Sequence, residues 1–150
     1  MILCDVNVLL CAHKEGADRH DEYKAWLEDA MNGEEAFGVS DLVLSSMLRI
    51  VTHPQVFDPP STWERAREFA DAVRSAPSAT PIAPGPRHWQ IFTELGGKAG
   101  VRGNLVPDAY LAALAIESGS EWITADRGFA RYPRLRFRHP LEPKLFPTHE

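Results

Sequence analysis

Three aspartates stand where they could share one metal ion. The run Met1–Asp5 is typical of a strand buried on both faces that ends in Asp5, and "WITAD" is a second such strand that ends in Asp126. Asp108 follows Pro107 in the first turn of a predicted helix. Ligands of parallel sheets bind outside the carboxyl ends of the strands, where helix N-termini also lie. We therefore expect the three carboxylates to meet at one rim of the sheet.

This grouping of acids predicts a site for a hard divalent cation. Carboxylates packed close together stay ionised only when a positive charge lies between them. Mg²⁺ or Mn²⁺ prefers such oxygen ligands, and the waters that it keeps can supply a nucleophile that attacks phosphorus. Taken singly, Asp5 and Asp108 could each be a helix cap and Asp126 could begin a turn. Their shared edge favours the metal site.

The elements that must position these acids alternate along the chain. Strand-like runs cover residues 1–5, 36–40, 80–84, 121–126 and 134–140, and helical patterns cover 6–12, 19–33, 41–53, 62–76, 86–95 and 107–119. Ser40 is a candidate N-cap for the helix over 41–53, and the glycine-rich stretch 96–104 is expected to be a loop. Alternation of this kind predicts a parallel sheet with helices on both faces.

Length and composition favour one ordinary domain. The chain has 150 residues, so we expect a single domain over 1–140 followed by a loose tail over 141–150. The net charge of −5 argues against nucleic-acid binding through overall charge alone, although residues 127–139 are locally basic. Two cysteines at positions 4 and 11 match no disulfide framework or zinc spacing, and no run suits a signal peptide or membrane span. These features predict a cytoplasmic protein without a membrane partner.

Three segments resemble one known family. "MILCDVNVLLCA", "VPDAYLAALAIESG" and "WITADRGFARYPRLRF", with "LVLSSMLRIVTHPQVF" between them, are similar to PIN-domain proteins, and specifically to the VapC toxins of type II toxin–antitoxin systems. The resemblance extends from Met1 to about His139. It implies a PIN-like three-layer α/β/α sandwich with a central, mostly parallel twisted sheet. It also implies a Mg²⁺-dependent endoribonuclease that cuts tRNA or rRNA, is a homodimer, and is neutralised by a cognate VapB-type antitoxin.

The resemblance assigns roles to individual residues. By it, Asp5, Asp108 and Asp126 would be the catalytic, metal-binding acids, with Mn²⁺ able to replace Mg²⁺. Asn7 would orient Asp5 or contact substrate, and the Thr124 hydroxyl would act similarly. The remaining candidates are contacts to the RNA backbone, which position the substrate rather than specify its sequence: Arg49, Arg127 and Arg131.

One position departs from the family pattern. PIN domains usually carry a glutamate on the third helix, three residues before an arginine. The arginine here is Arg49, so that position is Ser46, which supplies no charge. Asp41 lies five residues earlier on the same helix and is not expected to substitute fully. We expect weaker metal affinity, with one tightly held ion rather than two.

Other functions fit the residues less well. A phosphatase of the haloacid dehalogenase type would need a second aspartate where Asn7 stands, and a receiver-like signalling domain would need a lysine after a fifth strand. A degenerate domain that binds RNA or a partner without cutting remains an alternative, with Ser46 as its cause.

Overall fold

A five-stranded parallel sheet forms the centre of the molecule. The structure is a computed structural model that describes residues 1–142. The strand order is β3-β2-β1-β4-β5, so β1 is the central strand. The strands are short: β1 (Ile2–Cys4), β2 (Phe37–Val39), β3 (Ala79–Pro81), β4 (Glu121–Ile123) and β5 (Phe137–Arg138). Because β1 pairs in parallel with β4 over all three of its residues, the chain that follows each strand leaves the sheet at the same edge.

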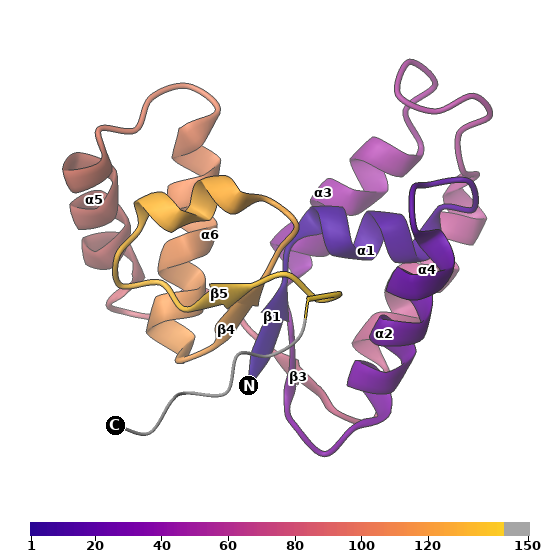
Figure 1. Cartoon of the computed structure of the whole chain (residues 1–150), viewed down its shortest axis with the longest axis horizontal. Coiled ribbons are helices and arrows are strands. Elements are labelled where there is room, and N and C mark those ends of the chain that lie inside the picture. The colour runs from indigo at the N-terminus through magenta and orange to yellow at the C-terminus, as the bar shows by residue number, and fades with distance from the viewer. Residues whose placement is uncertain (143–150) are drawn as a thin grey trace.

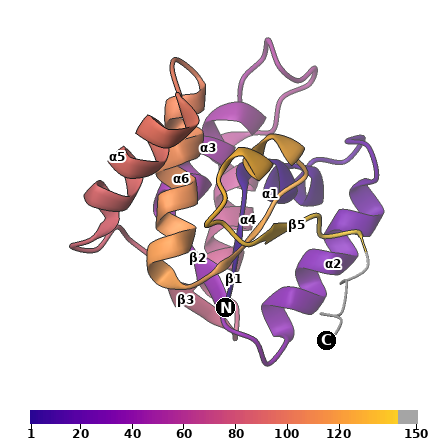
Figure 2. The ribbon, with the colours of Figure 1, turned by 60° about the vertical axis from the view of Figure 1, so that its left-hand side comes forward.

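Helices cover both faces of this sheet, as the alternation of elements predicts. The structure has α1 (Val6–His13), α2 (His20–Asn32), α3 (Asp41–Val51), α4 (Trp63–Arg74), α5 (His88–Ala99) and α6 (Leu105–Ser118). Figures 1 and 2 show α5 and α6 together on one side of the sheet and α1 to α4 on the other. The α/β fold and its parallel sheet are therefore confirmed.

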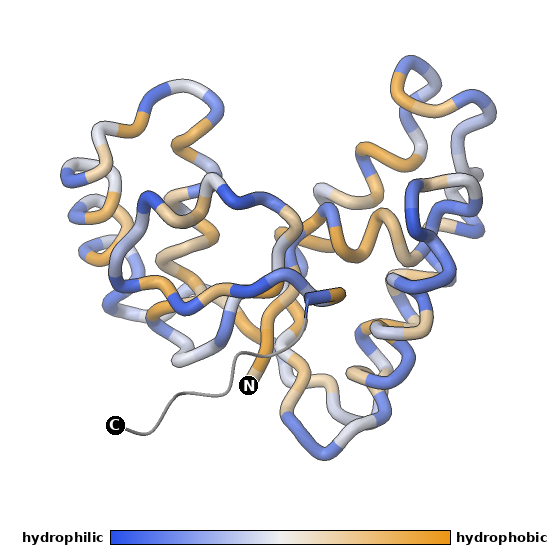
Figure 3. Tube along the Cα trace, in the orientation of Figure 1, coloured by the Kyte–Doolittle hydropathy of each residue, from blue (hydrophilic) through white to orange (hydrophobic). Residues whose placement is uncertain are grey.

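The core fills the space between these layers. Trp122, Phe37 and Met47 come from two strands and α3, and each is essentially inaccessible to solvent. Figure 3 shows hydrophobic residues along the central strand β1 and in stretches of the helices, with hydrophilic residues between them. Burial of strands on both faces is the reason that their sequences lack the alternation of a half-exposed strand.

Capping residues are present at the start of α3 and at the end of α6. The Ser40 hydroxyl accepts a hydrogen bond from the backbone N–H of Val43 and so caps α3, as predicted. Gly119 ends α6 in the left-handed conformation (φ 69°), which glycine adopts without a steric cost. These caps fix where α3 and α6 begin and end relative to the sheet.

Several segments differ from the sequence-based expectation. The strand expected over 121–126 ends at Ile123, so Asp126 lies three residues beyond β4 rather than at its end. The strand expected over 134–140 is limited to Phe137–Arg138.

Residues 96–99 are the last turn of α5 rather than loop, and the helix ends only at Gly100 (φ 62°). Each glycine costs a helix about 1 kcal/mol, but packing of α5 on α6 around buried Leu95 outweighs this cost. Another difference is a short 3-10 helix, η1 (Arg127–Arg131), which follows β4. The hydrophobic pattern of the sequence did not predict a helix there.

The predicted tail lies largely outside the described residues. Only residues 141 and 142 of the expected 141–150 segment are described, where they form part of a turn. The domain boundary at residue 140 therefore stays a prediction. In the described part of the chain, no helix has the length and apolar character needed to cross a bilayer.

Candidate acidic active site

Asp5 occupies the junction between the central strand and α1. Its backbone N–H donates to the Ile123 carbonyl at 2.8 Å, which holds the tip of β1 against the tip of β4. Its Oδ1 accepts a hydrogen bond from the Val6 N–H at 2.7 Å, so Asp5 is also the N-cap of α1. The capping role and the site role are therefore compatible, because one oxygen caps the helix and the other faces the neighbouring strand end.

The second oxygen of Asp5 is held by residues from both strand ends. The Thr124 hydroxyl donates to Asp5 Oδ2 at 2.7 Å, and Asn7 Nδ2 donates to the same oxygen at 3.3 Å. The amide oxygen of Asn7 accepts from the Ala125 N–H at 3.3 Å, and the Thr124 Oγ1 accepts from the Asp126 N–H at 3.0 Å. Thr124 and Asn7, predicted to support the site, thus join the strand ends that carry Asp5 and Asp126.

The charges of the acids act on one another. The pKa of Asp5 is raised to about 6: burial is the largest cause, the charges of Asp108 and Asp126 add to it, and the hydrogen bonds from Thr124 and Val6 oppose it. The pKa of Asp108 is also raised, first by burial and then by Asp126, while Arg131 opposes the change. The charges of Asp108 and Asp126 thus act on Asp5, and that of Asp126 acts on Asp108, so the three acids lie within electrostatic range of one another.

Gly128 separates Asp126 from an arginine. Asp126 Oδ1 accepts from the Gly128 N–H at 2.8 Å, and Arg131 Nε donates to the Gly128 carbonyl at 2.7 Å. A Cβ at Gly128 would lie 2.9 Å from Asp126 Oδ1 and 3.1 Å from an Arg131 nitrogen. Only a residue without a side chain leaves both groups in place. Sequence reasoning missed this glycine, although the Asp-x-Gly spacing of a turn could have indicated it.

The donor atoms suit a hard divalent cation, but the side chains are not arranged as a complete coordination shell. Carboxylate and amide oxygens are the ligands that such ions prefer. The pKa values of Asp5 and Asp108 are raised first by burial and then by neighbouring acids, and a cation would oppose both effects. Among residues 1–142, however, no group of three or more His, Cys, Asp or Glu side chains is close enough to hold an ion as placed.

The third helix adds no carboxylate to the acids. Ser46 is half-buried on α3 and Arg49 is exposed. Asp41 is directed elsewhere, because its Oδ1 lies 3.0 Å from Arg74 Nε on α4 in an exposed ion pair. Neither Ser46 nor Arg49 makes a hydrogen bond or ion pair with the three acids in the described structure.

The basic stretch after β4 divides into different environments. Arg131 lies beside Asp126 and Asp108. Arg127 is almost fully exposed and pairs with Glu142 at 3.1 Å. Arg138 forms a largely buried pair with Glu121 at 2.7 Å, which joins β5 to β4. Arg131 thus lies next to the acids and Arg127 is exposed to solvent, whereas Arg138 makes a structural contact between strands.

Comparisons with known proteins agree with this geometry. The PIN domain family model matches residues 2–135. Ribonuclease VapC43 of Mycobacterium tuberculosis is 43% identical over 142 residues, which cover 95% of this chain and 97% of the relative. Ribonuclease VapC25 of the same species is 37% identical over 140 residues, covering 93% and 99%.

Solved structures share the fold. A chain of VapBC2 from Rickettsia felis, bound to a promoter DNA fragment, superposes with a TM-score of 0.66 at 18% identity and covers 93% of this chain and 98% of that one. A chain of VapBC-1 from nontypeable Haemophilus influenzae gives 0.67 at 12% identity, covering 95% and 100%. At these identities the likeness concerns the three-layer architecture alone.

Proposed function

The chain belongs to the PIN-domain family, within its VapC ribonuclease group, and from that membership we propose that it is the toxin of a type II toxin–antitoxin system. Its activity would be metal-dependent endoribonuclease action, that is, hydrolysis of RNA phosphodiester bonds, with tRNA or rRNA as substrate. The observation that carries this proposal is the hydrogen-bonded junction of Asp5, Asn7 and Thr124 in a chain that is 43% identical to a VapC ribonuclease.

We assign Asp5, Asp108 and Asp126 as the residues that hold the metal. All-oxygen donors favour Mg²⁺, and Mn²⁺ shares this preference and would substitute for it. When bound, the cation would neutralise charge on the phosphate and supply a nucleophilic water. Support comes from the mutual electrostatic influence of the acids and from their common edge of the sheet.

The protein's own groups prepare the site before any substrate arrives. Thr124 and Asn7 donate hydrogen bonds to Asp5 Oδ2, which favours the ionised carboxylate in spite of its burial. The Thr124 hydroxyl also accepts from the Asp126 N–H, so it sets the spacing between the two strand ends. Arg131, fixed by the Gly128 carbonyl, presents a positive charge to the RNA backbone beside the acids. Arg127 and Arg49 are exposed and would add backbone contacts further out.

Partners follow from the same family membership. The family relatives carry the VapC name, and the solved structures with this fold are those of VapBC assemblies. We propose that a cognate VapB-type antitoxin binds this chain and blocks the acidic rim. We also propose that the toxin is a homodimer and acts in the cytoplasm, where its RNA substrate lies.

The decisive experiment compares RNA cleavage with Mg²⁺, with Mn²⁺ and with EDTA. Wild type and Asp5→Ala are incubated with total tRNA and rRNA, and Asp18→Ala, which removes an exposed acid elsewhere, is the matched control. We expect cleavage only by wild type and the control, and only with metal. Cleavage that persists in EDTA or in Asp5→Ala would remove the metal mechanism.

A domain that binds RNA without cutting it is the second candidate. The observation that favours it is the serine at position 46 together with the incomplete coordination shell among residues 1–142. Normal Mg²⁺ binding by calorimetry with no cleavage of any RNA would establish it. Growth arrest on expression, relieved by the product of the neighbouring gene, would instead support the toxin.

A further inference from the structure

A small cleft lies between the C-terminal part of α5 and the segment that ends η1. Its volume is about 200 Å³, and it is lined by residues 94–99 of α5 on one side and by residues 131–134 on the other. Arg131 forms part of its wall and also lies beside Asp126 and Asp108. The cleft is therefore next to the acidic site, and one arginine borders both.

Cations outnumber carboxylates in this cleft. Lys98, Arg131 and Arg134 line it, whereas Glu94 is the one carboxylate among its lining residues in the described part of the chain. Glu94 is a weak counterion, because its Oε2 lies 3.9 Å from the nearest Arg134 nitrogen and both side chains are about half exposed. An excess of positive charge therefore remains, and the three cations define what we call the basic cleft.

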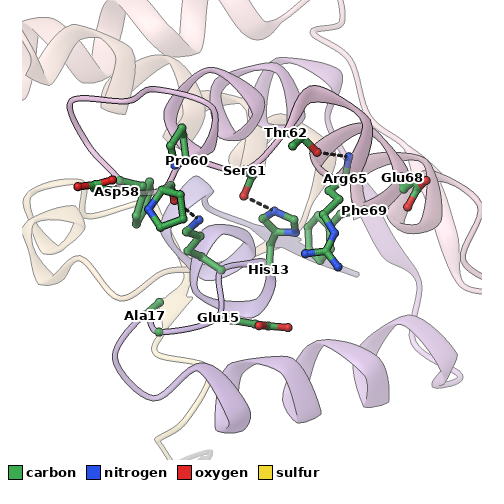
Figure 4. Close-up of a pocket in the computed structure, with 14 residues that line it drawn as sticks. His13, Glu15, Ala17, Asp58, Pro60, Ser61, Thr62, Arg65, Glu68 and Phe69 are labelled. Carbon is green, nitrogen blue, oxygen red and sulfur yellow. Dashed lines mark hydrogen bonds between the residues drawn. The ribbon is translucent and has the colours of Figure 1, made fainter.

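A larger pocket at the C-terminal end of α1 has the opposite balance of charge. Its volume is about 790 Å³ (Figure 4). Two cations line it, Lys14 and Arg65, and they are outnumbered by the carboxylates of Glu15, Asp58 and Glu68. His13 adds no positive charge at neutral pH, because burial and the neighbouring cations lower its pKa. An anion would therefore prefer the basic cleft, although it is the smaller of the two.

The distribution of charge along the chain favours the same side of the molecule. Residues 98–138 carry seven Lys or Arg and four Asp or Glu, whereas residues 1–97 carry eight and fifteen. The first of these segments includes α6, β4 and β5, which Figure 1 shows in one half of the molecule, with α1 to α4 in the other. A polyanion such as RNA is therefore repelled by one half and attracted to the other.

The basic groups keep hydrogen-bond donors for a ligand. Arg131 Nε donates to the Gly128 carbonyl at 2.7 Å, which fixes the guanidinium and leaves its terminal nitrogens for other partners. Lys98 is exposed in the last turn of α5 and, within residues 1–142, makes no ion pair or side-chain hydrogen bond. Pockets for drug-sized ligands measure about 300–1,000 Å³, so a cleft of this volume suits a smaller group such as a phosphate.

We propose that the basic cleft of Lys98, Arg131 and Arg134 binds a backbone phosphate of the RNA substrate that neighbours the phosphate at the acids. This proposal deepens the proposed ribonuclease function and rests on it. The RNA strand would then leave the acids across η1 and the end of α5, and not along α1. The cleft would contribute affinity and register, because such contacts position the backbone without reading its sequence.

The test is equilibrium binding of RNA with divalent metal omitted, so that nothing is cleaved. The probe is a fluorescein-labelled single-stranded RNA of mixed sequence and about 20 nucleotides, titrated at several salt concentrations. Wild type is compared with Lys98→Gln, Arg134→Gln and the double variant. The matched control is Arg65→Gln, which removes an exposed arginine from the larger pocket, where carboxylates are in excess.

We expect each single variant to bind the RNA about three- to tenfold more weakly and to reduce the slope of log K against log salt by about 0.7, with a greater loss in the double variant. Arg65→Gln should bind as wild type does. Three results would overturn the proposal: no measurable binding by wild type, unchanged affinity in the double variant, or an equal loss in Arg65→Gln. Metal-dependent cleavage by wild type, measured in parallel, shows whether a negative result concerns the basic cleft alone or the ribonuclease function as well.

Discussion

The hydroxyl of Thr124 donates a 2.7 Å hydrogen bond to Asp5 across 119 positions of sequence. This bond joins the ends of β1 and β4 and favours the ionised form of a carboxyl whose pKa burial raises. The chemistry that we propose depends on it, because the same hydroxyl also accepts from the Asp126 N–H.

Removal of the Thr124 hydroxyl should weaken metal use. Thr124→Val keeps the volume of the side chain but removes the donor, so the pKa of Asp5 should rise and Asp126 should lose an anchor. We expect cleavage activity or metal affinity to fall about 10- to 100-fold, as for other residues that orient a metal ligand. A Mg²⁺ titration of RNA cleavage measures this, with Thr124→Ser as the variant that should retain activity. Equal losses in both variants would show that the hydroxyl is not responsible.

The buried carboxyl of Asp5 should destabilise the metal-free protein at neutral pH. Its pKa is about 6 in the folded state and 3.8 as the reference value, so the folded state holds the proton more tightly. Below about pH 4 the Asp5 carboxyl is protonated in both the folded and the unfolded state, and it costs the folded state nothing. The loss of folding stability that its ionisation causes grows between about pH 4 and 6 and is complete above pH 6. In EDTA, Asp5→Asn should therefore raise the free energy of unfolding by on the order of 1–3 kcal/mol at about pH 8 and by little at about pH 4.

Urea denaturation at the two pH values checks this dependence. Asp18→Asn, a change at an exposed acid, is the control and should show no such pH dependence. Added Mg²⁺ should stabilise wild type more than Asp5→Asn, because only the wild type keeps all three carboxylates. An Asp5→Asn protein that is less stable than wild type at both pH values would contradict the argument.

A methyl group at Gly128 should disturb the site without unfolding the protein. In Gly128→Ala the new Cβ would approach Asp126 Oδ1 to 2.9 Å and an Arg131 nitrogen to 3.1 Å, so at least one of them must move. We expect activity to fall roughly 10- to 100-fold, since small misplacements of catalytic groups are costly. Circular dichroism reports whether Gly128→Ala is folded, and the rate of RNA cleavage reports whether its site is disturbed. Gly97→Ala, where nothing lies within 4 Å, is the control and should stabilise α5 by about 0.5–1 kcal/mol.

A glutamate at position 46 should strengthen metal binding. Ser46→Glu would place a fourth carboxylate at the position where related domains usually carry one, and a higher ligand charge tightens binding of hard cations. We expect the Mg²⁺ concentration for half-maximal cleavage to fall several-fold. Ser45→Glu, at the adjacent exposed position on α3, is the control. Unchanged metal dependence in Ser46→Glu would mean that this side chain does not reach the acids.

Much of the fold could be predicted because its signals are local. The buried runs at residues 2–4 and 121–123 form the strands β1 and β4, Ser40 caps the start of α3 as predicted, and Gly119 ends α6. Local signals failed over 96–99, where glycines remain helical because α5 packs against α6. The propensity of a residue is a small energy, and a packed interface outweighs it.

The sequence by itself indicated that Asp5 follows a buried strand and that Asp108 lies in the first turn of a helix, and therefore which residues could share a cation. Only the tertiary structure decided how they are held, since the bond between Thr124 and Asp5 exists because β4 lies beside β1 in the sheet. It also decided that Asp41 pairs with Arg74 and that Lys98, Arg131 and Arg134 line one cleft. The physical reason is that periodicity and capping involve neighbours along the chain, whereas contacts across it depend on the order in which strands and helices pack.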